Sequence, residues 1–489
     1  MSRIYRAVAF SAIERYGTMV IYIVYAAALS RLLTPEEFGL YALVLSCITI
    51  MSAPFQEVGG ANYLIQKRSL SEHDIRSAFT ITSVLSLAVG FVTFELRDVI
   101  AWAFSNAALG HAMAIASLNF VLTPFATTLS ALFRRDLEFK ILAKCNLAGT
   151  IVIALVSVGL AILGFSFMAP IWGMLAGNSV AVVLMMAARR NFRNFLPAFS
   201  GYTDVVSFGA YSGAISALSV FYNLAPQIFL GRNLGFAAVG LYNRALNAAQ
   251  MFDKFVAQVV APVIMPAFVA KTEAGKSLKL LYLEAIEILS VVQWPFLLWV
   301  AVLAPAIIHV WLGPAWSDVV PLVRLLCIAQ LALFGGYLTY PVLVAAGSVR
   351  DALIAALISL PPSLAMSFAA SFFGAQALAA AALFSLPLQA AVAIYFVSRR
   401  LAIRPAELFS AVSKSVVVTF CTSIGVLVCA ALVNAQVIPS LPAILLSMSL
   451  GAIGWWIGMA LTGHPLLGRL ENASRYLPFR IPKSLFESS

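Results

Sequence analysis

Cations interrupt the long apolar runs of this chain. Arg15 lies in the first run, and Arg244 and Lys254 lie in the eighth. An ionisable group at membrane depth costs about 2.5–3.5 kcal/mol on insertion scales, so each one needs a physical reason. Carboxylates accompany these cations in the same or neighbouring runs: Glu14, Glu57, Asp253, Glu284 and Glu287.

The eighth run also carries a polar stripe. Asn243, Asn247, Gln250, Lys254 and Gln258 follow one another at steps of three or four residues, which places them on one helical face. A lipid-facing helix would not keep such a stripe, so this face is expected to line a water-filled cavity. Two interpretations of the charges stay open: a charged belt at the cytoplasmic mouth of that cavity, or ion pairs satisfied at helix ends by snorkelling.

The composition predicts an all-α polytopic membrane protein. Hydrophobic residues make up 62% of the 489 residues and charged residues 10%, against about 25% in soluble domains. The mean hydropathy is +0.95. A spanning helix needs about 20 apolar residues. Fourteen runs qualify, near 9–30, 38–64, 78–96, 108–133, 141–163, 167–188, 206–230, 237–268, 280–304, 321–346, 351–373, 376–398, 409–433 and 441–462.

Lys and Arg are unevenly shared between alternate connections. One side holds 23 of them, and the other holds four: Arg31, Arg97, Arg232 and Arg324. Cytoplasmic loops carry the excess of basic residues, so both termini are expected in the cytoplasm. The net charge of +11 is explained by these loops, without nucleic acid as a partner.

Two turns repeat each other. Residues 31–41 and 232–242 share an Arg, a Leu and a contiguous Gly-Leu-Tyr at matching positions. Six spans separate them, so both are expected on the outer side, as in transporters built from parallel repeats. The repeat predicts a six-helix lobe at 1–188, a cytoplasmic linker at 189–204, a second six-helix lobe at 205–400, two additional spans at 401–462 and a cytoplasmic tail at 463–489.

Several local patterns predict structure rather than chemistry. Thr34–Glu37 and Ser71–Asp74 read as capping boxes, the second opening a short interfacial helix before the third span. Gly173/Gly177 and Gly454/Gly458 indicate close helix packing. Trp294, Trp299, Trp311 and Trp316 are expected in an aromatic belt at the outer interface. The residues show no metal-ligand set and no catalytic arrangement. We therefore expect no bound metal, no cofactor and no enzymatic activity.

Three segments carry a family resemblance: LSRLLTPEEFGLYA at 29–42, EVGGANYLIQ at 57–66 and LSEHDIRSAF at 70–79. They resemble the polysaccharide-export (Wzx-type) flippases of the multidrug/oligosaccharidyl-lipid/polysaccharide exporter superfamily. The resemblance implies a bacterial inner-membrane protein that moves undecaprenyl-diphosphate-linked oligosaccharide repeat units across the bilayer, for exopolysaccharide or lipopolysaccharide assembly. Its expected partners are the lipid-linked oligosaccharide, the bilayer, and the polymerase and other polysaccharide-assembly proteins.

The resemblance, together with the polar groups in the apolar runs, suggests roles for individual residues. Related flippases hold the pyrophosphate with cations in a central cavity, and Arg15, Arg244 and Lys254 are the candidates here. Asn243, Asn247 and Gln250 are the candidates for contacts to sugar. Glu14, Glu57, Asp253, Glu284 and Glu287 are expected to close an inner gate or to carry a coupling ion. The alternative is a drug/cation antiporter of the same superfamily, which would need acidic cavity residues to dominate.

Overall fold

The computed structural model describes residues 3–58, 61–67, 69–189, 191–198, 202–254 and 277–474. Helices joined by short turns make up these residues, and no strand occurs among them. The chain divides into two compact units, Met1–Asn243 with Ser371–Ala375, and Arg244–Ala370 with Gln376–Ser489. The expected lobe boundaries come from the internal sequence repeat, whereas these two units are defined by contacts. The lobe boundaries therefore remain a prediction.

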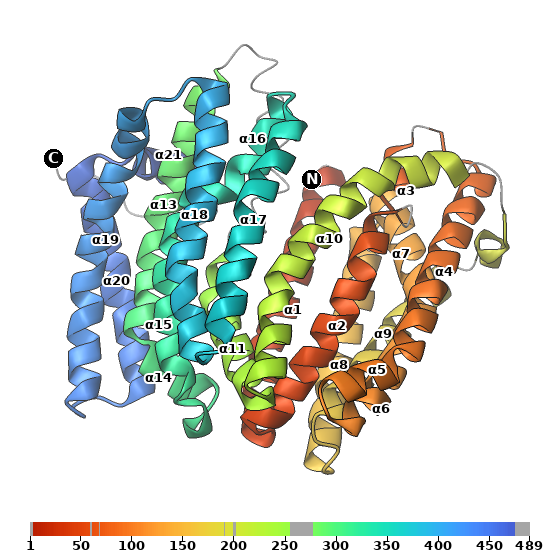
Figure 1. The fold of residues 1–489 in the computed structure, drawn as a ribbon. Helices are drawn as coiled ribbons and strands as arrows, with labels where there is room; N and C mark the ends of the chain where they lie inside the picture. Colours follow the sequence, from red (N-terminus) through yellow and green to blue (C-terminus); the bar gives the residue numbers. More distant parts are fainter. Residues whose placement is uncertain are drawn as a thin grey trace. The chain divides into compact units, whose positions relative to one another are not determined.

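The first unit is a bundle in which α2 packs along α10 and α1 packs along α8 (Figure 1). Its helices are α1 (Arg3–Leu32), α2 (Pro35–Val58), α3 (Ala61–Gln66), α4 (Glu72–Glu95), α5 (Arg97–Ala103), α6 (Ala107–Ser117), α7 (Asn119–Arg135), α8 (Phe139–Ile162), α9 (Met168–Ala188), η1 (Phe192–Phe195) and α10 (Tyr202–Asn233). Helix α11 (Phe236–Ala249) begins in this unit and ends in the second.

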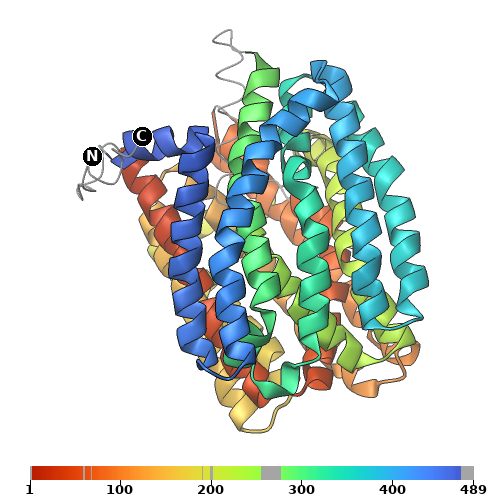
Figure 2. The same ribbon diagram turned by 90° about the vertical axis from the view of Figure 1, so that its left-hand side faces the viewer.

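In the second unit, α13 packs against α19, and α19 against α20 (Figure 2). Its elements are α13 (Leu278–Val302), α14 (Ala304–Trp311), η3 (Pro314–Trp316), α15 (Val319–Gln330), η4 (Leu331–Leu338), α16 (Thr339–Ala345), α17 (Val349–Ser371), α18 (Ala375–Leu401), α19 (Pro405–Asn434), α20 (Ser440–Thr462) and α21 (Pro465–Ser474).

The helices confirm an all-α polytopic membrane protein. Among the described residues, twelve helices are long and apolar enough to cross a membrane, and each falls on one of the fourteen expected runs. Helix α10, with 32 residues, occupies the run at 206–230. Helix α11 begins the run at 237–268, whose remainder lies outside the described residues from 255 onward. The expected count of about fourteen is therefore approximate, since part of the run at 237–268 lies outside the described residues.

Both capping boxes form, but the interfacial helix does not. The backbone N–H of Glu37 donates to Thr34 Oγ1 over 3.3 Å, and the N–H of Thr34 donates to Glu37 Oε2 over 2.8 Å. Ser71 and Asp74 make the same reciprocal pair. The expectation of a separate interfacial helix was wrong, because α4 runs unbroken from Glu72 to Glu95. A capping box marks where a helix starts, not where the membrane begins.

Close helix packing at the glycine pairs is confirmed within each unit. A methyl group on Gly173 would lie 2.9 Å from the carbonyl oxygen of Ile153, and one on Gly458 would lie 2.7 Å from Cα of Val418. These separations are tighter than real side chains show, so α8 with α9 and α19 with α20 approach through backbone.

The duplicated turns touch each other. A methyl group on Gly39 would overlap the carbonyl oxygen of Phe236 and lie 3.0 Å from the nitrogen of Gly240. A methyl group on Gly240 would overlap the carbonyl oxygen of Pro35. The first turns of α2 and α11 therefore cross backbone to backbone, at equivalent glycines of the two copies.

Candidate functional site

The expected polar stripe begins on α11 and continues past the end of this helix at Ala249, and two of its members meet. Gln258 lies outside the described residues. Lys254 Nζ donates a hydrogen bond of 2.6 Å to Asn247 Oδ1, two turns earlier on the same face. Residues 253 and 254 adopt π-helical geometry, a local widening that is frequent at functional sites. Gln250 and Asp253 are half-buried beside this pair. The structure thus places the Lys254 ammonium, beyond the end of α11, against the Asn247 amide in the last turn of α11, within the second unit.

Asn243 belongs to a packing network in the first unit. Its Nδ2 donates to Gln227 Oε1 over 3.0 Å, and Ser46 Oγ donates to the same oxygen over 3.1 Å. Gln227 is 2% exposed. The network joins α2, α10 and α11, so Asn243 has a structural partner besides any substrate. Gln227 was not among the predicted site residues, although it is an amide in the apolar part of α10, as Asn223 is.

Arg244 is braced by a tryptophan. The guanidinium carbon lies 5.7 Å from the centroid of the Trp316 ring, and the two residues are 1% and 0% exposed. A desolvated cation–π contact of this kind stabilises by about 2 kcal/mol. The expectation of an aromatic belt was wrong for Trp316, because the 3₁₀ turn η3 buries its side chain against Arg244 instead.

The other tryptophans expected in the belt also have internal partners. Trp294 Nε1 donates to the carbonyl oxygen of Leu331, Trp299 Nε1 donates to Ser447 Oγ, and Trp311 is buried. The indole N–H groups of Trp294 and Trp299 therefore donate to partners inside the unit, and the position of the belt relative to a membrane stays a prediction.

The charges on α1 and α2 are placed in part. Asn146 on α8 donates a short hydrogen bond to Glu14 Oε1, in a pair that joins α8 to α1. Arg15, the next residue, is half-buried. Glu57 lies in the last turn of α2, and its side chain lies outside the described ones. Glu14 therefore already serves helix packing.

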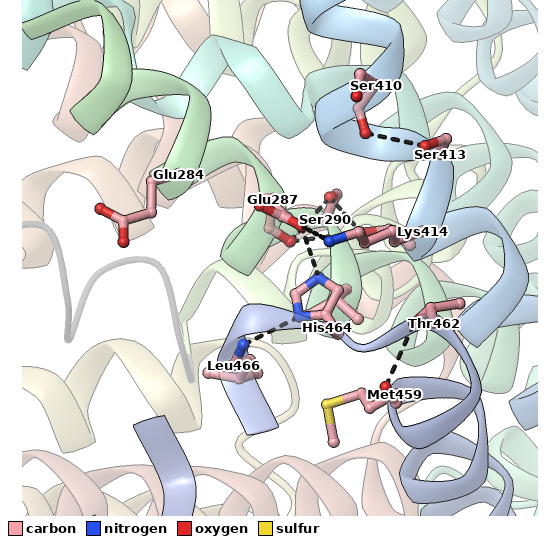
Figure 3. A network of polar contacts seen from close by, with 12 residues as sticks. Glu284, Glu287, Ser290, Ser410, Ser413, Lys414, Met459, Thr462, His464 and Leu466 are labelled. Atoms are coloured by element: carbon pink, nitrogen blue, oxygen red, sulfur yellow. Dashed lines mark hydrogen bonds and ion pairs between the residues drawn. The ribbon is translucent and has the colours of Figure 1, made fainter. Parts of the chain in front are cut away.

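Glu284 and Glu287 belong to a charge cluster at one end of α13. Figure 3 shows Glu287, Lys414 and His464 pointing toward one another. Glu287 Oε1 lies 3.4 Å from Lys414 Nζ on α19 and 3.9 Å from His464 Nε2, just before α21. Glu284 pairs with Arg469 of α21. Glu284 therefore contacts α21, and Glu287 contacts α19 and the residue directly before α21.

A pocket of about 1130 Å³ opens beside this cluster, between α13 and α19. Glu284, Glu287, Glu407 and Lys414 are among its lining residues. Glu407 pairs with Lys279 over 2.7 Å. The sequence analysis missed Lys414, although the rule that selected Glu287, an ionisable group inside an apolar run, applies to it equally.

The described part of the chain gives no site for a metal ion. Its His, Cys, Asp and Glu side chains form no group of three or more that could hold one. All five cysteines are free thiols, and four of them are buried.

Comparison of the sequence with known proteins identifies a family and several relatives. The family model described as "Polysaccharide biosynthesis protein" matches residues 28–321. The lipopolysaccharide biosynthesis protein WzxC of Escherichia coli K12 is 24% identical over 311 residues, 63% of each chain. The succinoglycan biosynthesis transport protein ExoT of Rhizobium meliloti is 23% identical over 335 residues, 66% of each chain. The alignments thus span just under two thirds of these relatives.

Solved structures share the fold. The lipid II flippase MurJ, in an inward closed conformation, matches with a TM-score of 0.72 and 10% identity over 93% of this chain and 99% of that one. An inward-facing multidrug resistance transporter of the MATE family, within the MOP superfamily, matches with a TM-score of 0.64 and 15% identity, over 81% of this chain and 98% of that one.

Proposed function

The chain belongs to the polysaccharide biosynthesis protein family, and we propose that it is a flippase for undecaprenyl-diphosphate-linked oligosaccharide repeat units. The units cross the bacterial inner membrane from the cytoplasmic to the outer leaflet, for exopolysaccharide or lipopolysaccharide assembly. The names of WzxC and ExoT, which state polysaccharide biosynthesis and transport, support the substrate class. The shared fold with MurJ and the MATE transporter supports a transport mechanism rather than an enzyme.

One structural observation supports the proposed binding of the pyrophosphate by particular residues. The Lys254–Asn247 pair sets an ammonium beside an amide at the end of α11. A pyrophosphate can leave water only if charged donors replace its hydration, and hydrogen bonds to charged groups contribute about 1.5–3 kcal/mol each. A sugar needs amide and hydroxyl partners of the kind that Asn247 and Gln250 offer. Lys254 is the residue we assign to the pyrophosphate.

The other candidate cations differ from Lys254 in their surroundings. Arg15 lies half-buried on α1 in the first unit, next to the Glu14–Asn146 pair, and it stays a candidate for the pyrophosphate there. Arg244 is covered by Trp316, so its first role in our proposal is to hold α11 in place. Asp253, beside Lys254, is the carboxylate best placed to balance that ammonium or to carry a coupling ion.

The glycine crossing supplies a gate in this proposal. The excess of Lys and Arg on one side assigns both termini to the cytoplasm and the two duplicated turns to the outer side. Closing the outer end then brings Gly39 and Gly240 into backbone contact, and opening it separates them. Alternating access would therefore open and close where the two copies of the turn meet.

Deleting the gene from its native host tests the proposed function. We expect surface polymer to disappear and lipid-linked repeat units to accumulate facing the cytoplasm, because the units are completed there. Polymer is measured at the cell surface, and the units by extraction and sugar analysis. Complementation with the wild-type gene is the control. Unchanged polymer together with increased sensitivity to cationic drugs would support the antiporter instead.

A further inference from the structure

Within the second unit, helix α21 packs through an apolar face and two polar contacts. Leu466 and Leu467 pack against a buried cluster made of Val291, Val418 and Met459, from α13, α19 and α20. This apolar contact seats the short helix. Ten residues are too few for a helix that is stable alone, so α21 depends on these tertiary contacts.

The first polar contact is the Arg469–Glu284 ion pair, which joins α21 to α13. The second is His464, the residue directly before α21. The backbone N–H of Leu466 donates to His464 Nδ1 over 3.2 Å, so the imidazole caps the start of α21. Nδ1 must therefore carry a lone pair, and the ring proton of the neutral form sits on Nε2.

His464 Nε2 points at Glu287. The ring is 0% exposed, and Nε2 lies 3.9 Å from Glu287 Oε1 without a hydrogen-bond partner of its own. Lys414 of α19 meets the same carboxylate oxygen at 3.4 Å. Glu284 and Glu287 are three residues apart, so they share one face of α13. Both polar contacts of α21 are thus made to one short stretch of α13, from Glu284 to Glu287.

The same end of α13 is tied to α19 by further polar contacts. Ser290 and Ser415 are joined by a hydrogen bond of 2.8 Å, and Lys279 pairs with Glu407. The pocket of about 1130 Å³ lies among these contacts, and Pro465, the first residue of α21, is part of its lining.

We propose that α21 is a strap that closes one side of this pocket and holds the start of α13 to α19 and α20. While Arg469 and His464 stay on the two carboxylates, α13 and the two additional helices move as one body. Release of the strap removes the hold of α21 on α13 and uncovers that side of the pocket, while the contacts between α13 and α19 remain. In this proposal, Glu284 and Glu287 attach α21 to α13 and do not close an inner gate. The consequence for transport rests on the proposed function, whereas the strap itself does not.

The cap makes the strap sensitive to pH. Burial lowers the pKa of His464 and Lys414 lowers it further, while Glu287 acts in the opposite direction without reversing the shift. The folded protein therefore favours the neutral ring. Protonation places a hydrogen on Nδ1, which can then no longer accept from Leu466. The contribution of the cap is present above the unperturbed pKa of about 6.5 and is lost as the pH falls below it.

Hydrogen exchange of the full-length protein in lipid nanodiscs tests the strap. In Arg469→Glu and in Glu284→Arg, we expect the amides of α21 to exchange about two- to fivefold faster, the range that a half-exposed ion pair supports. The double variant Glu284→Arg/Arg469→Glu restores the pair with reversed charges and should restore slow exchange. Lys279→Glu is the matched control, because it breaks an ion pair at the same pocket that does not involve α21.

A second arm isolates the cap. After correction for intrinsic exchange rates, lowering the pH from 7.5 to 5.5 should speed exchange in α21 of the wild type. His464→Asn should remove this pH dependence, because an asparagine oxygen caps a helix at either pH. Unchanged exchange in the single charge reversals, or a double variant no slower than they are, would overturn the strap. Hydrogen exchange does not depend on transport activity. The strap and the proposed function can therefore fail independently of each other.

Discussion

Replacing Gly39 by alanine is expected to abolish polymer export and to lower the thermal stability of the protein. A methyl group there overlaps the carbonyl oxygen of Phe236, and backbone cannot turn aside as a flexible side chain can. Overpacking of this kind typically costs about 1–3 kcal/mol. The first turns of α2 and α11 must then separate, so the outer end can no longer close. Gly240→Ala should behave alike, because its methyl group overlaps the carbonyl oxygen of Pro35.

Gly159→Ala is the matched control. Gly159 lies inside α8, and a methyl group there meets nothing within 4 Å. Alanine is favoured over glycine in a helix by about 1 kcal/mol, so this variant should be neutral or slightly more stable and should export normally. Export is measured by surface polymer, and stability by thermal unfolding in detergent. Wild-type export by Gly39→Ala and Gly240→Ala would remove the gate from the proposal.

Replacing Arg244 by alanine is the second change with a large expected effect. It removes the cation–π contact with Trp316 and leaves a cavity beside a buried ring. Large-to-small substitutions at such sites cost about 2–5 kcal/mol. We expect lost polymer export and a lower unfolding temperature, in a protein that still inserts into the membrane. Arg244→Lys should recover only part of the stability, because an ammonium lacks the planar group that stacks on indole.

Arg324→Ala controls for the loss of a cation as such. Arg324 is exposed and donates to the carbonyl oxygen of Ala301, so its loss should change stability little. Trp316→Ala should reproduce the instability of Arg244→Ala if the brace is the cause. Arg244→Ala protein that is abundant, stable and fully active would contradict both the structural and the functional assignment of this residue.

Much of the fold follows from local sequence. Apolar runs such as 141–163 had to be membrane helices because of their length, and α8 occupies Phe139–Ile162. Ser71 with Asp74 marked a helix start for the same local reason. Close packing at Gly173 and Gly458 was foreseeable because small residues at a four-residue spacing line one helix face.

The candidate site was predictable only where its contacts lie along one helix. Lys254 and Asn247 meet because they are only seven residues apart, in the last turn of α11 and the helical residues that follow it. The partners of Arg244 and Glu284 are Trp316 and Arg469, which lie far along the chain, and only tertiary packing brings them near. No spacing rule connects such residues. The duplicated turn showed symmetry in the sequence, but that its two glycines touch each other is a property of the fold.

The central claim is translocation of a lipid-linked oligosaccharide, and purified protein in sealed liposomes tests it most directly. The liposomes contain an undecaprenyl-diphosphate-linked oligosaccharide, and an enzyme added outside reports the sugar that reaches the outer leaflet. We predict faster arrival with the wild type than in protein-free liposomes. Lys254→Met should slow arrival by about tenfold or more, since it removes a charged donor. Replacing the exposed Lys140 by Met should leave the rate unchanged. Arrival no faster with the wild type than without protein would contradict the flippase.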